Sequence, residues 1–555
     1  MEMEKMIASG GDGGVPELED PVVARPAAEE EKESRRRRPL LVAVLAALLL
    51  LAFFVLGRES TSTVWEMASA KLLAVVNNDA AAGDVADELL GGLLAAVDDR
   101  RTCRSRYELW RYYKHFPYRP SPHLLRSLRA YEARHRRCAP GTPLYVKAVE
   151  QLKSGGHGGA AAAAMEEECR YVVWLPFDGL GNRMLSMASG FLYALLTGRV
   201  FLVALPPDSG DLFCEPFPNT TWLFTPQDYP VDNLPWLGQS PNVSLAALLA
   251  ANKTIDGAAY VYLSLGWQMT DGTFFCGEHQ AVLGKVSWLF MFSDLYFVPS
   301  LYPIAEFRDE LRRLFPAAME SISHLLLRYL LHPSNPVWDM VTAYYASNLA
   351  YADKRIGIQI RMFDFASVPA DDLYNQILSC SRQENILPET DGDEVAAAGN
   401  STTAIFIASL YADYYERLKT RYQHVDEAAS GRSSKVGVFQ KTHEEQQATE
   451  KLEHNQRALA EIFLLSLSEE MVTSGMSTFG YVSSSIAGVR PAILLPAHDH
   501  KVPATPCRRA VSMEPCNLTP PRGVTCSRGM AVDGEDVARH LKVCEDRQQG
   551  VKLFD

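Results

Sequence analysis

The stretch from Tyr171 to Leu205 reads YVVWLPFDGLGNRMLSMASGFLYALLTGRVFLVAL and decides the fold class of the chain. It begins with a short apolar run that is typical of a buried strand, and a Gly-rich loop follows. A helical pattern then extends from Met184 to Leu196, and a second apolar run covers Val200 to Leu205. This order of strand, helix and strand predicts a βαβ unit and therefore an α/β fold.

The loop between the first strand and the helix has the composition of an anion-binding turn. Gly179 and Gly181 allow the backbone to approach a ligand closely. Asn182 and Arg183 place hydrogen-bond donors near a helix start, where the helix dipole favours negative charge. A tight strand-to-helix turn without a ligand would use the same residues, so the loop alone does not define a site.

A second block, Arg355–Arg361, alternates isoleucines with polar or small residues and predicts a strand that ends at Arg361. Ligands of open α/β sheets bind at the carboxyl ends of the strands. A guanidinium there can form paired hydrogen bonds with a diphosphate. A structural salt bridge is the alternative role for Arg361.

A third block contains the elements expected for a second Rossmann-like half. Val436–Gln440 and Met471–Ser474 are predicted strands, and His443–Gln446 is predicted to open the helix between them. Ser477–Gly480 then leads into another helix, whose hydroxyls and free amides could hold an anion. Ordinary capping is the alternative, but Arg361 in the same half favours a nucleotide-sugar diphosphate site.

The composition supports a globular protein with an acidic surface. The chain has 555 residues, of which 47% are hydrophobic and 22% are charged, and its formal net charge is −13. This balance argues against a duplex-binding protein, so nucleic acid is not an expected partner. An anionic ligand must instead be held by a local group of cations.

The amino-terminal region predicts a single membrane anchor. The first 39 residues are polar and end in Arg35–Arg38 and Pro39. Leu40–Leu56 is an uncharged apolar run of 17 residues, which just crosses a thin bilayer. A cleaved signal peptide is the alternative, but a long tail precedes the run. The arginines predict type II topology, with everything from Gly57 onward in the lumen.

The chain is thus predicted to have five parts. They are a cytosolic tail (1–39), a transmembrane anchor (40–57), a stem (58–100), an N-terminal Rossmann-like domain on the acceptor side (101–345) and a C-terminal donor-binding domain (346–555). Two facing Rossmann-like domains predict a GT-B-like glycosyltransferase fold with the acceptor cleft between the halves. A homodimer is compatible with the sequence.

The distribution of cysteines and sequons agrees with a lumenal location. All ten cysteines lie after the anchor, where disulfides can form. The Arg- and Tyr-rich stretch Cys103–Cys138 predicts a disulfide-tied cap on the catalytic domain. Five sequons predict glycosylation at Asn219, Asn242, Asn252, Asn400 and Asn517. Together with the short span, these features predict a Golgi membrane protein.

Seven motif blocks follow one another along the chain in a fixed order. They are GLGNRMLSMASGFLYALLTGRV (Gly179–Val200), SDLYFVPSL (Ser293–Leu301), HPSNPVW (His332–Trp338), IGIQIRMFDF (Ile356–Phe365), HEEQQATEKLEHNQRALAEIFLLSLS (His443–Ser468), TSGMSTFGYV (Thr473–Val482) and CRRAVSMEPC (Cys507–Cys516). These blocks closely resemble the plant galactoside 2-alpha-L-fucosyltransferases, the xyloglucan fucosyltransferase family. The resemblance spans roughly Cys169–Cys526.

The resemblance implies an inverting, metal-independent transfer of fucose from GDP-β-L-fucose to the 2-hydroxyl of a galactose in a cell-wall glycan. It implies that Arg361 grips the donor pyrophosphate and stabilises departing GDP. The donor-binding residues that it implies are Gly181, Asn182, Arg183, Arg361, Ser477, Thr478 and Phe479, with His443 and Glu445 as hydrogen-bond partners of guanosine or merely a helix start.

Inversion requires that a carboxylate or a water relay take the proton of the attacking hydroxyl. Asp294 is the leading candidate because it follows an apolar run inside the SDLYFVPSL block, although capping a turn or pairing with an arginine is equally open. Asp391-Gly392-Asp393 matches a metal-binding DxD motif, but no apolar strand leads into it, so no metal site is expected. Arabinogalactan protein or another galactoside is the alternative acceptor, and a catalytically silent Golgi scaffold is the alternative function.

Overall fold

The computed structural model describes residues 88–97, 99–113, 116–155, 169–238, 241–255, 258–316, 322–389, 401–428, 436–524, 526 and 540–554. The predicted tail (1–39), the anchor (40–57) and most of the stem (58–100) lie outside the described residues. Within those ranges, no helix combines the length and apolar character needed to cross a membrane.

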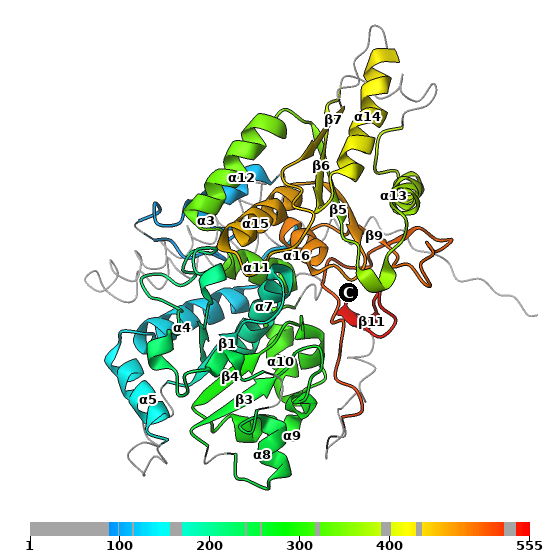
Figure 1. Cartoon of the computed structure of the whole chain (residues 1–555). Coiled ribbons are helices and arrows are strands. Elements are labelled where there is room, and N and C mark those ends of the chain that lie inside the picture. The colour runs from blue at the N-terminus through cyan, green and yellow to red at the C-terminus, as the bar shows by residue number, and fades with distance from the viewer. Residues whose placement is uncertain are drawn as a thin grey trace, which may run out of the picture. The chain divides into compact units, whose positions relative to one another are not determined.

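The first half is built on a four-stranded parallel sheet with the order β2-β1-β4-β3 (Figure 1). Its strands are β1 (Tyr171–Leu175), β2 (Val200–Val203), β3 (Tyr260–Ser264) and β4 (Trp288–Phe292). Helix α7 (Leu180–Thr197) connects β1 to β2, and Tyr171 pairs with Val200, which confirms the predicted βαβ unit. The helix ends at Gly198, whose φ of 64° closes it in the left-handed conformation.

The second half contains a six-stranded sheet with the order β10-β9-β8-β5-β6-β7. Its strands are β5 (Lys354–Ile360), β6 (Thr403–Ser409), β7 (Val436–Gln440), β8 (Glu470–Ser474), β9 (Ala492–Leu494) and β10 (Cys507–Arg509). All neighbours are parallel except β10, which runs antiparallel to β9 at the edge. The α/β class with parallel sheets in both halves is therefore confirmed. The predicted division near residue 345 stays a prediction.

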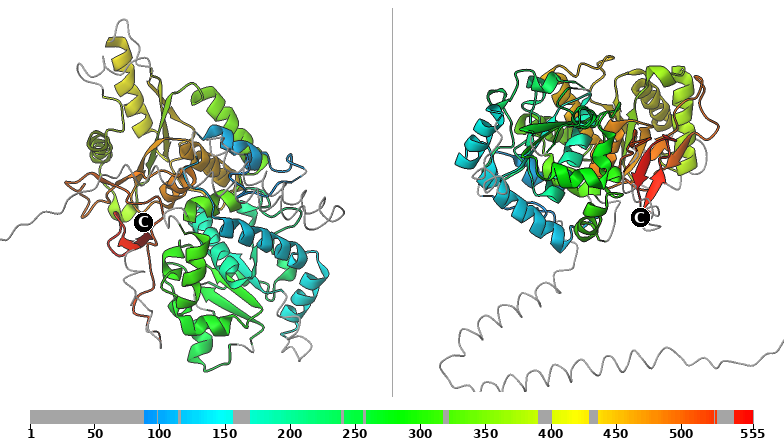
Figure 2. Two further views of the ribbon diagram at one scale, coloured as in Figure 1. Left: turned by 180° about the vertical axis from the view of Figure 1, so that it is seen from behind. Right: turned by 90° about the horizontal axis from the view of Figure 1, so that it is seen from below.

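Helices cover these sheets and join the two halves (Figures 1 and 2). The remaining helices are α3 (Arg104–Glu108), α4 (Pro122–Cys138), α5 (Pro143–Lys153), α8 (Leu245–Ala250), α9 (Gly277–Leu283), α10 (Ala305–Leu314), α11 (Ile322–Leu330), α12 (Asn335–Asn348), α13 (Ala370–Glu384), α14 (Asp413–Ala428), α15 (Leu452–Ser466) and α16 (Thr478–Ala487). Helix α16 packs against α7 and α11, and α15 packs against α12. One hydrophobic core consequently includes residues of both halves.

Five disulfides hold distant segments together. They join Cys103 to Cys214, Cys138 to Cys169, Cys276 to Cys526, Cys380 to Cys507, and Cys516 to Cys544. The first two tie both ends of the N-terminal stretch Cys103–Cys138 to the first half, as a disulfide-tied cap requires. The third ties the first half to the C-terminal segment.

The segment predicted to begin a helix at His443 is a loop, and α15 begins only at Leu452. Side chains hold this loop in place of backbone helix bonds. The Thr442 N–H donates to Glu461 Oε1 at 3.0 Å, and Glu444 pairs with His454 and with an arginine of α15. Glu445 has a φ of 60°, a left-handed conformation that a helix cannot contain.

The structure also corrects one glycosylation site. Asn219, Asn242 and Asn252 are exposed, and Asn400 lies outside the described residues. Asn517 is fully buried, and its side-chain amide donates to Ser300 Oγ at 2.9 Å. A glycan on that amide would have to occupy the protein interior, so the prediction for Asn517 is wrong.

Candidate active site

A cavity of about 530 Å³ lies where loops from both halves meet. It is lined from the first half by the GLGN loop, Trp267 and Asp294, and from the second half by residues around Arg361, by α15 and by the start of α16. Seven of the ten predicted catalytic and donor-binding residues line it: Gly181, Asn182, Asp294, Arg361, Ser477, Thr478 and Phe479. The structure therefore brings together residues separated by up to about three hundred positions in sequence.

Gly181 brings the two halves into close contact. A Cβ at this position would lie 2.7 Å from Thr478 Oγ1 and 2.9 Å from the Phe479 amide nitrogen, so only glycine fits. Asn182 lines the cavity and donates from its amide to Asp178 Oδ2 at 2.6 Å. The GLGN loop thus abuts the amino-terminal end of α16 directly.

Arg183 has a structural role that its sequence context did not reveal. Its guanidinium pairs with Asp208 at 2.7 Å and donates to Ser209 Oγ at 2.8 Å. It does not line the cavity. Its charge is paired with that of Asp208, and its role in donor binding stays a prediction.

Arg361 lies just beyond β5, at the carboxyl edge of the second sheet. Its backbone N–H donates to Ser474 Oγ at 2.9 Å, which fixes the end of the strand beside β8. Its guanidinium carbon lies 5.5 Å from the centre of the Phe363 ring. No acidic side chain in the described part of the chain pairs with it. The structural salt bridge considered for Arg361 is formed by Arg355 instead. The Arg355 Nε donates to Glu469 at 3.0 Å.

The amino-terminal end of α16 forms the wall next to the GLGN loop. Ser477 is the N-cap residue, yet its hydroxyl makes no capping hydrogen bond. Ser477, Thr478 and Phe479 all line the cavity. The first amides of a helix carry partial positive charge and have no partner within the helix, so this wall suits an anionic group.

Asp294 follows β4 at the carboxyl edge of the first sheet and is only 5% exposed. Burial, with a smaller contribution from the charge of Asp178, raises the pKa of Asp294 to about 7. Its Oδ1 is buried and has no hydrogen-bond partner among the described residues. A carboxylate with a free oxygen and a near-neutral pKa in a cavity is suited to accept a proton.

The loop before α15 contributes to the cavity through residues that the sequence analysis did not single out. His443 and Glu445 are exposed and do not line it, whereas Thr442 and Glu444 do. From α15, His454, Arg457 and Glu461 line it as well. Burial raises the pKa of Glu461 to about 7. The sequence signal that could have identified these three residues is their near-helical spacing as polar residues within an otherwise apolar helix.

The described residues offer no convincing protein ligand set for a metal. Two groups have suitably close ligand atoms, namely Cys276 with Glu278 and Cys526, and Cys516 with Cys544 and Asp546. In both groups the cysteine sulfurs are already joined in disulfides, so they cannot act as thiolate ligands. The Asp391-Gly392-Asp393 motif lies outside the described residues.

Comparison with known proteins assigns the chain to a family. The family model described as xyloglucan fucosyltransferase matches residues 61–526. The galactoside 2-alpha-L-fucosyltransferase of Pisum sativum is 42% identical over 477 residues, covering 84% of this chain and 82% of the pea protein. The Arabidopsis thaliana protein of the same name is 43% identical over 476 residues, covering 84% of this chain and 83% of its own length.

A solved structure shows the same relationship. Arabidopsis thaliana FUT1, determined as an arginine-to-lysine mutant in complex with GDP, is 41% identical and superimposes with a TM-score of 0.75. The match covers 84% of this chain and 100% of that one. Sequence and fold therefore agree over the part of the chain that forms the cavity, and the chain belongs to the xyloglucan fucosyltransferase family.

Proposed function

We propose that this chain transfers L-fucose from GDP-β-L-fucose to the 2-hydroxyl of a galactose in a cell-wall glycan, with inversion and without a metal. The relatives named galactoside 2-alpha-L-fucosyltransferase and the GDP complex of FUT1 support this proposal. The observation that carries it is the cavity itself. It combines an arginine without an acidic partner and a helix start in one half with a buried carboxylate in the other.

Arg361 and the start of α16 form the donor side of the proposed site. The diphosphate of GDP-fucose gains negative charge as its bond to the fucose C1 breaks. A guanidinium and helix amides that are already oriented can stabilise this charge without reorganisation. They would fill the role that a divalent cation has in metal-dependent transferases. GDP is the leaving group.

Asp294 provides the base on the opposite side. It removes the proton from the galactose 2-hydroxyl as that oxygen bonds to the fucose C1, while the electrons of the C1–O bond leave with GDP. Attack from the face opposite the leaving group inverts the configuration at C1. Asp294 lines this cavity from the first half, and its buried Oδ1 has no hydrogen-bond partner among the described residues.

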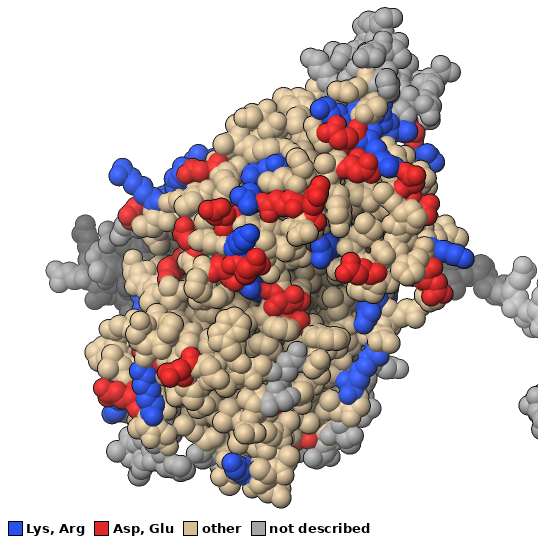
Figure 3. Space-filling model, viewed as in Figure 1, with Lys and Arg blue, Asp and Glu red and all other residues tan. Residues whose placement is uncertain are grey.

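The surface of the first half suits a neutral polysaccharide such as galactosylated xyloglucan. On the face shown in Figure 3, charged side chains gather over the second half, whereas the surface over β3, α8 and α9 has few. Trp267 of the first half is 57% exposed and Phe365 of the second half is 68% exposed, and both line the cavity. Exposed aromatic rings offer flat apolar faces against which sugar rings can pack.

Replacing Trp267 with alanine is expected to raise the KM for the glycan acceptor about tenfold, since a packed aromatic ring contributes on the order of 1.5 kcal/mol. The KM for GDP-fucose should change little. Trp236 is 80% exposed but does not line the cavity, so Trp236→Ala is the matched control. Equal acceptor KM values for the two variants would exclude Trp267 from acceptor binding.

The membrane location is part of the same proposal. The apolar run at 40–57 would anchor the chain in the Golgi membrane as a single-pass type II protein with a lumenal catalytic part. The five disulfides support an oxidising compartment for the described residues.

The test is a transfer assay with the full-length chain, GDP-fucose and galactosylated xyloglucan in excess EDTA. Fucosylated xyloglucan is the expected product. Product on arabinogalactan acceptors only would keep the mechanism and change the acceptor. Activity that disappears with EDTA and returns with a divalent cation would overturn metal independence, and lack of turnover on every galactoside would overturn the proposed enzyme.

A further inference from the structure

The chain ends in a small hairpin that lies beyond the residues matched by the family model. Strands β11 (Leu541–Val543) and β12 (Val551–Leu553) pair in antiparallel fashion, with Val543 opposite Val551. The connecting loop runs from Cys544 to Gly550, whereas the family match ends at Cys526. In the front and back views of Figures 1 and 2, this red hairpin lies at the level where the two halves meet.

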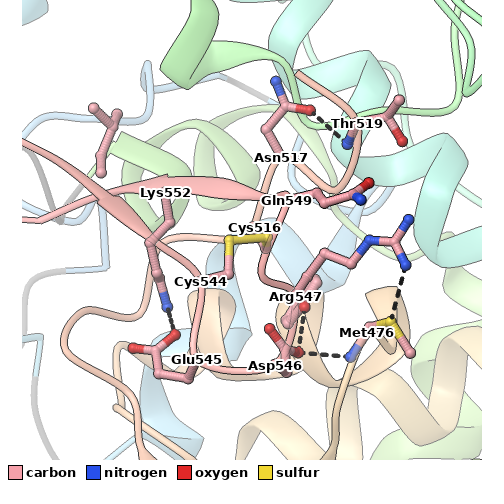
Figure 4. The surroundings of a disulfide bond; sticks show 12 residues. Met476, Cys516, Asn517, Thr519, Cys544, Glu545, Asp546, Arg547, Gln549 and Lys552 are labelled. Atoms are coloured by element: carbon pink, nitrogen blue, oxygen red, sulfur yellow. Dashed lines mark hydrogen bonds and ion pairs between the residues drawn. A yellow bond between two sulfur atoms is a disulfide. The ribbon is translucent and has the colours of Figure 1, made fainter. Parts of the chain in front are cut away.

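A disulfide and close packing hold the hairpin loop (residues 544–550) in one position (Figure 4). Cys544 is bonded to Cys516, and a Cβ on Gly550 would lie 2.3 Å from Cys516 Sγ, so the loop fits only with glycine there. The backbones of Val551 and Asn517 exchange hydrogen bonds of 2.8 and 3.1 Å. The hairpin is therefore attached at both ends of its loop, to Cys516 through Cys544 and to Asn517 through Val551.

Asp546 connects the hairpin loop to the donor side of the cavity. Its Oδ2 accepts a hydrogen bond from the Met476 backbone N–H and another from the Tyr481 hydroxyl, both at 2.6 Å. Met476 directly precedes the N-cap residue of α16, and Tyr481 lies in its first turns. Asp546 thus positions the wall formed by Ser477 and Thr478.

The next residue, Arg547, lines the cavity itself. Its Nη1 lies 3.9 Å from Met476 Sδ, a weak acceptor, and its buried Nε has no hydrogen-bond partner among the described residues. Among the residues that the structure describes, no carboxylate pairs with Arg547. By contrast, Lys552 of the same hairpin pairs with Glu545 at 3.1 Å. Figure 4 shows Arg547 directed to Met476 and Lys552 directed to Glu545.

A guanidinium has five donors with geometry that matches phosphate oxygens, and the only hydrogen-bond contact of the Arg547 guanidinium with the described residues is the weak one to Met476 Sδ. The neighbouring wall is a helix start that favours anions, and Arg361 lines the same cavity. A diphosphate carries enough charge and enough oxygens to engage more than one arginine.

We propose that Arg547 is a second diphosphate-binding arginine of the nucleotide-sugar site, delivered to it by the disulfide-closed C-terminal hairpin. This inference rests on the proposed function and deepens it, since it assigns a donor-binding role to a residue outside the family match. Asp546 has a positioning role, while Arg547 touches the ligand.

The test is direct binding of GDP, GMP and guanosine to the full-length chain, measured by titration calorimetry. Arg547→Ala is expected to weaken GDP binding about 10- to 100-fold, the effect of losing a charge-assisted hydrogen bond. GMP should be affected less and guanosine hardly at all. Arg547→Lys should retain part of the affinity for GDP because the charge remains.

Arg522→Ala is the matched control, because Arg522 also contacts the hairpin loop, donating to the Gln549 carbonyl at 2.7 Å, but does not line the cavity. Its affinity for GDP should equal that of the wild type. Wild-type affinity in Arg547→Ala, or an equal loss for guanosine and GDP, would overturn the diphosphate role while leaving the proposed function intact. If the wild-type chain binds no GDP, the proposed function fails first and the inference fails with it. Unchanged thermal unfolding of the alanine variant separates lost binding from lost folding.

Discussion

Replacing Arg361 with alanine is expected to lower the turnover of fucosyl transfer by about 10³-fold while the chain stays folded. The guanidinium has no acidic partner in the described structure, so its removal leaves no carboxylate buried without a counter-charge. What is lost is the stabilisation of charge on the departing GDP. Most of the effect should therefore appear in kcat, with a smaller loss of GDP affinity.

Steady-state kinetics of three variants would check this prediction. Arg361→Lys keeps the charge but loses the fork geometry, so it should recover only part of the rate. Arg508→Ala removes an exposed arginine from the edge strand β10, outside the cavity, and should behave as the wild type. Near-normal turnover in Arg361→Ala would exclude Arg361 from the donor site, provided that thermal unfolding is unchanged in all three proteins.

The strands and the βαβ unit could be predicted because their signals are local. A strand that is buried on both faces needs a continuous apolar run, and β1 and β4 are buried at every position. The position of Arg361 followed from the same logic, since it comes directly after such a strand. Asp294 follows β4 in the same way. Parallel strands bring residues that follow them to one edge of a sheet, so both candidates reached the cavity.

The differences between the sequence-based expectations and the structure concern features that depend on contacts between distant residues. Arg183 and Arg361 were both predicted to bind the donor. Arg183 is paired with Asp208, whose position depends on the fold of an intervening helix and strand. The loop at His443 has the polar start of a helix, yet tertiary hydrogen bonds such as that from Thr442 to Glu461 hold it in another conformation. Asn517 has an ordinary sequon, and only packing against Ser300 shows that it is buried.

The C-terminal contribution to the cavity was equally hidden. The disulfide between Cys276 and Cys526 joins residues 250 positions apart, and the pairing of Cys516 with Cys544 is no more apparent from the sequence. These links bring Arg547 to a site whose other members end at Thr519. The sequence placed Arg547 in the C-terminal donor-binding domain, but the family resemblance ended near Cys526, so nothing singled this residue out.

Replacing Asp294 with asparagine is expected to lower kcat by about 10²- to 10⁴-fold, the usual contribution of a general base. The wild-type rate should fall as the pH drops below about 7, because burial raises the pKa of Asp294 to about 7 and only the ionised form accepts a proton. The residual rate of Asp294→Asn should lack this dependence. The pH profile of kcat measures both effects.

Glu461 provides the matched control because burial also raises its pKa to about 7 and it lines the same cavity. Its Oε1 already accepts hydrogen bonds from Thr442, whereas Asp294 Oδ1 has no partner among the described residues. Glu461→Gln should therefore retain the fall in rate below pH 7. If that fall disappears in Glu461→Gln and persists in Asp294→Asn, Glu461 is the base.

Stability measurements separate a catalytic role of Asp294 from a structural one. A carboxyl whose pKa is raised in the folded state stabilises the fold at low pH, and this stability is lost as the pH rises from about 4 to about 7. Above pH 7 the buried charge opposes folding, so Asp294→Asn should raise the free energy of unfolding at pH 8 while lowering kcat. If Asp294 had a structural role, Asp294→Asn would instead lower the free energy of unfolding at pH 8, and stability and activity would be lost together. The gain in stability and the loss of kcat are expected together because the ionised carboxylate that accepts the proton is a buried charge, which catalysis requires and the fold does not.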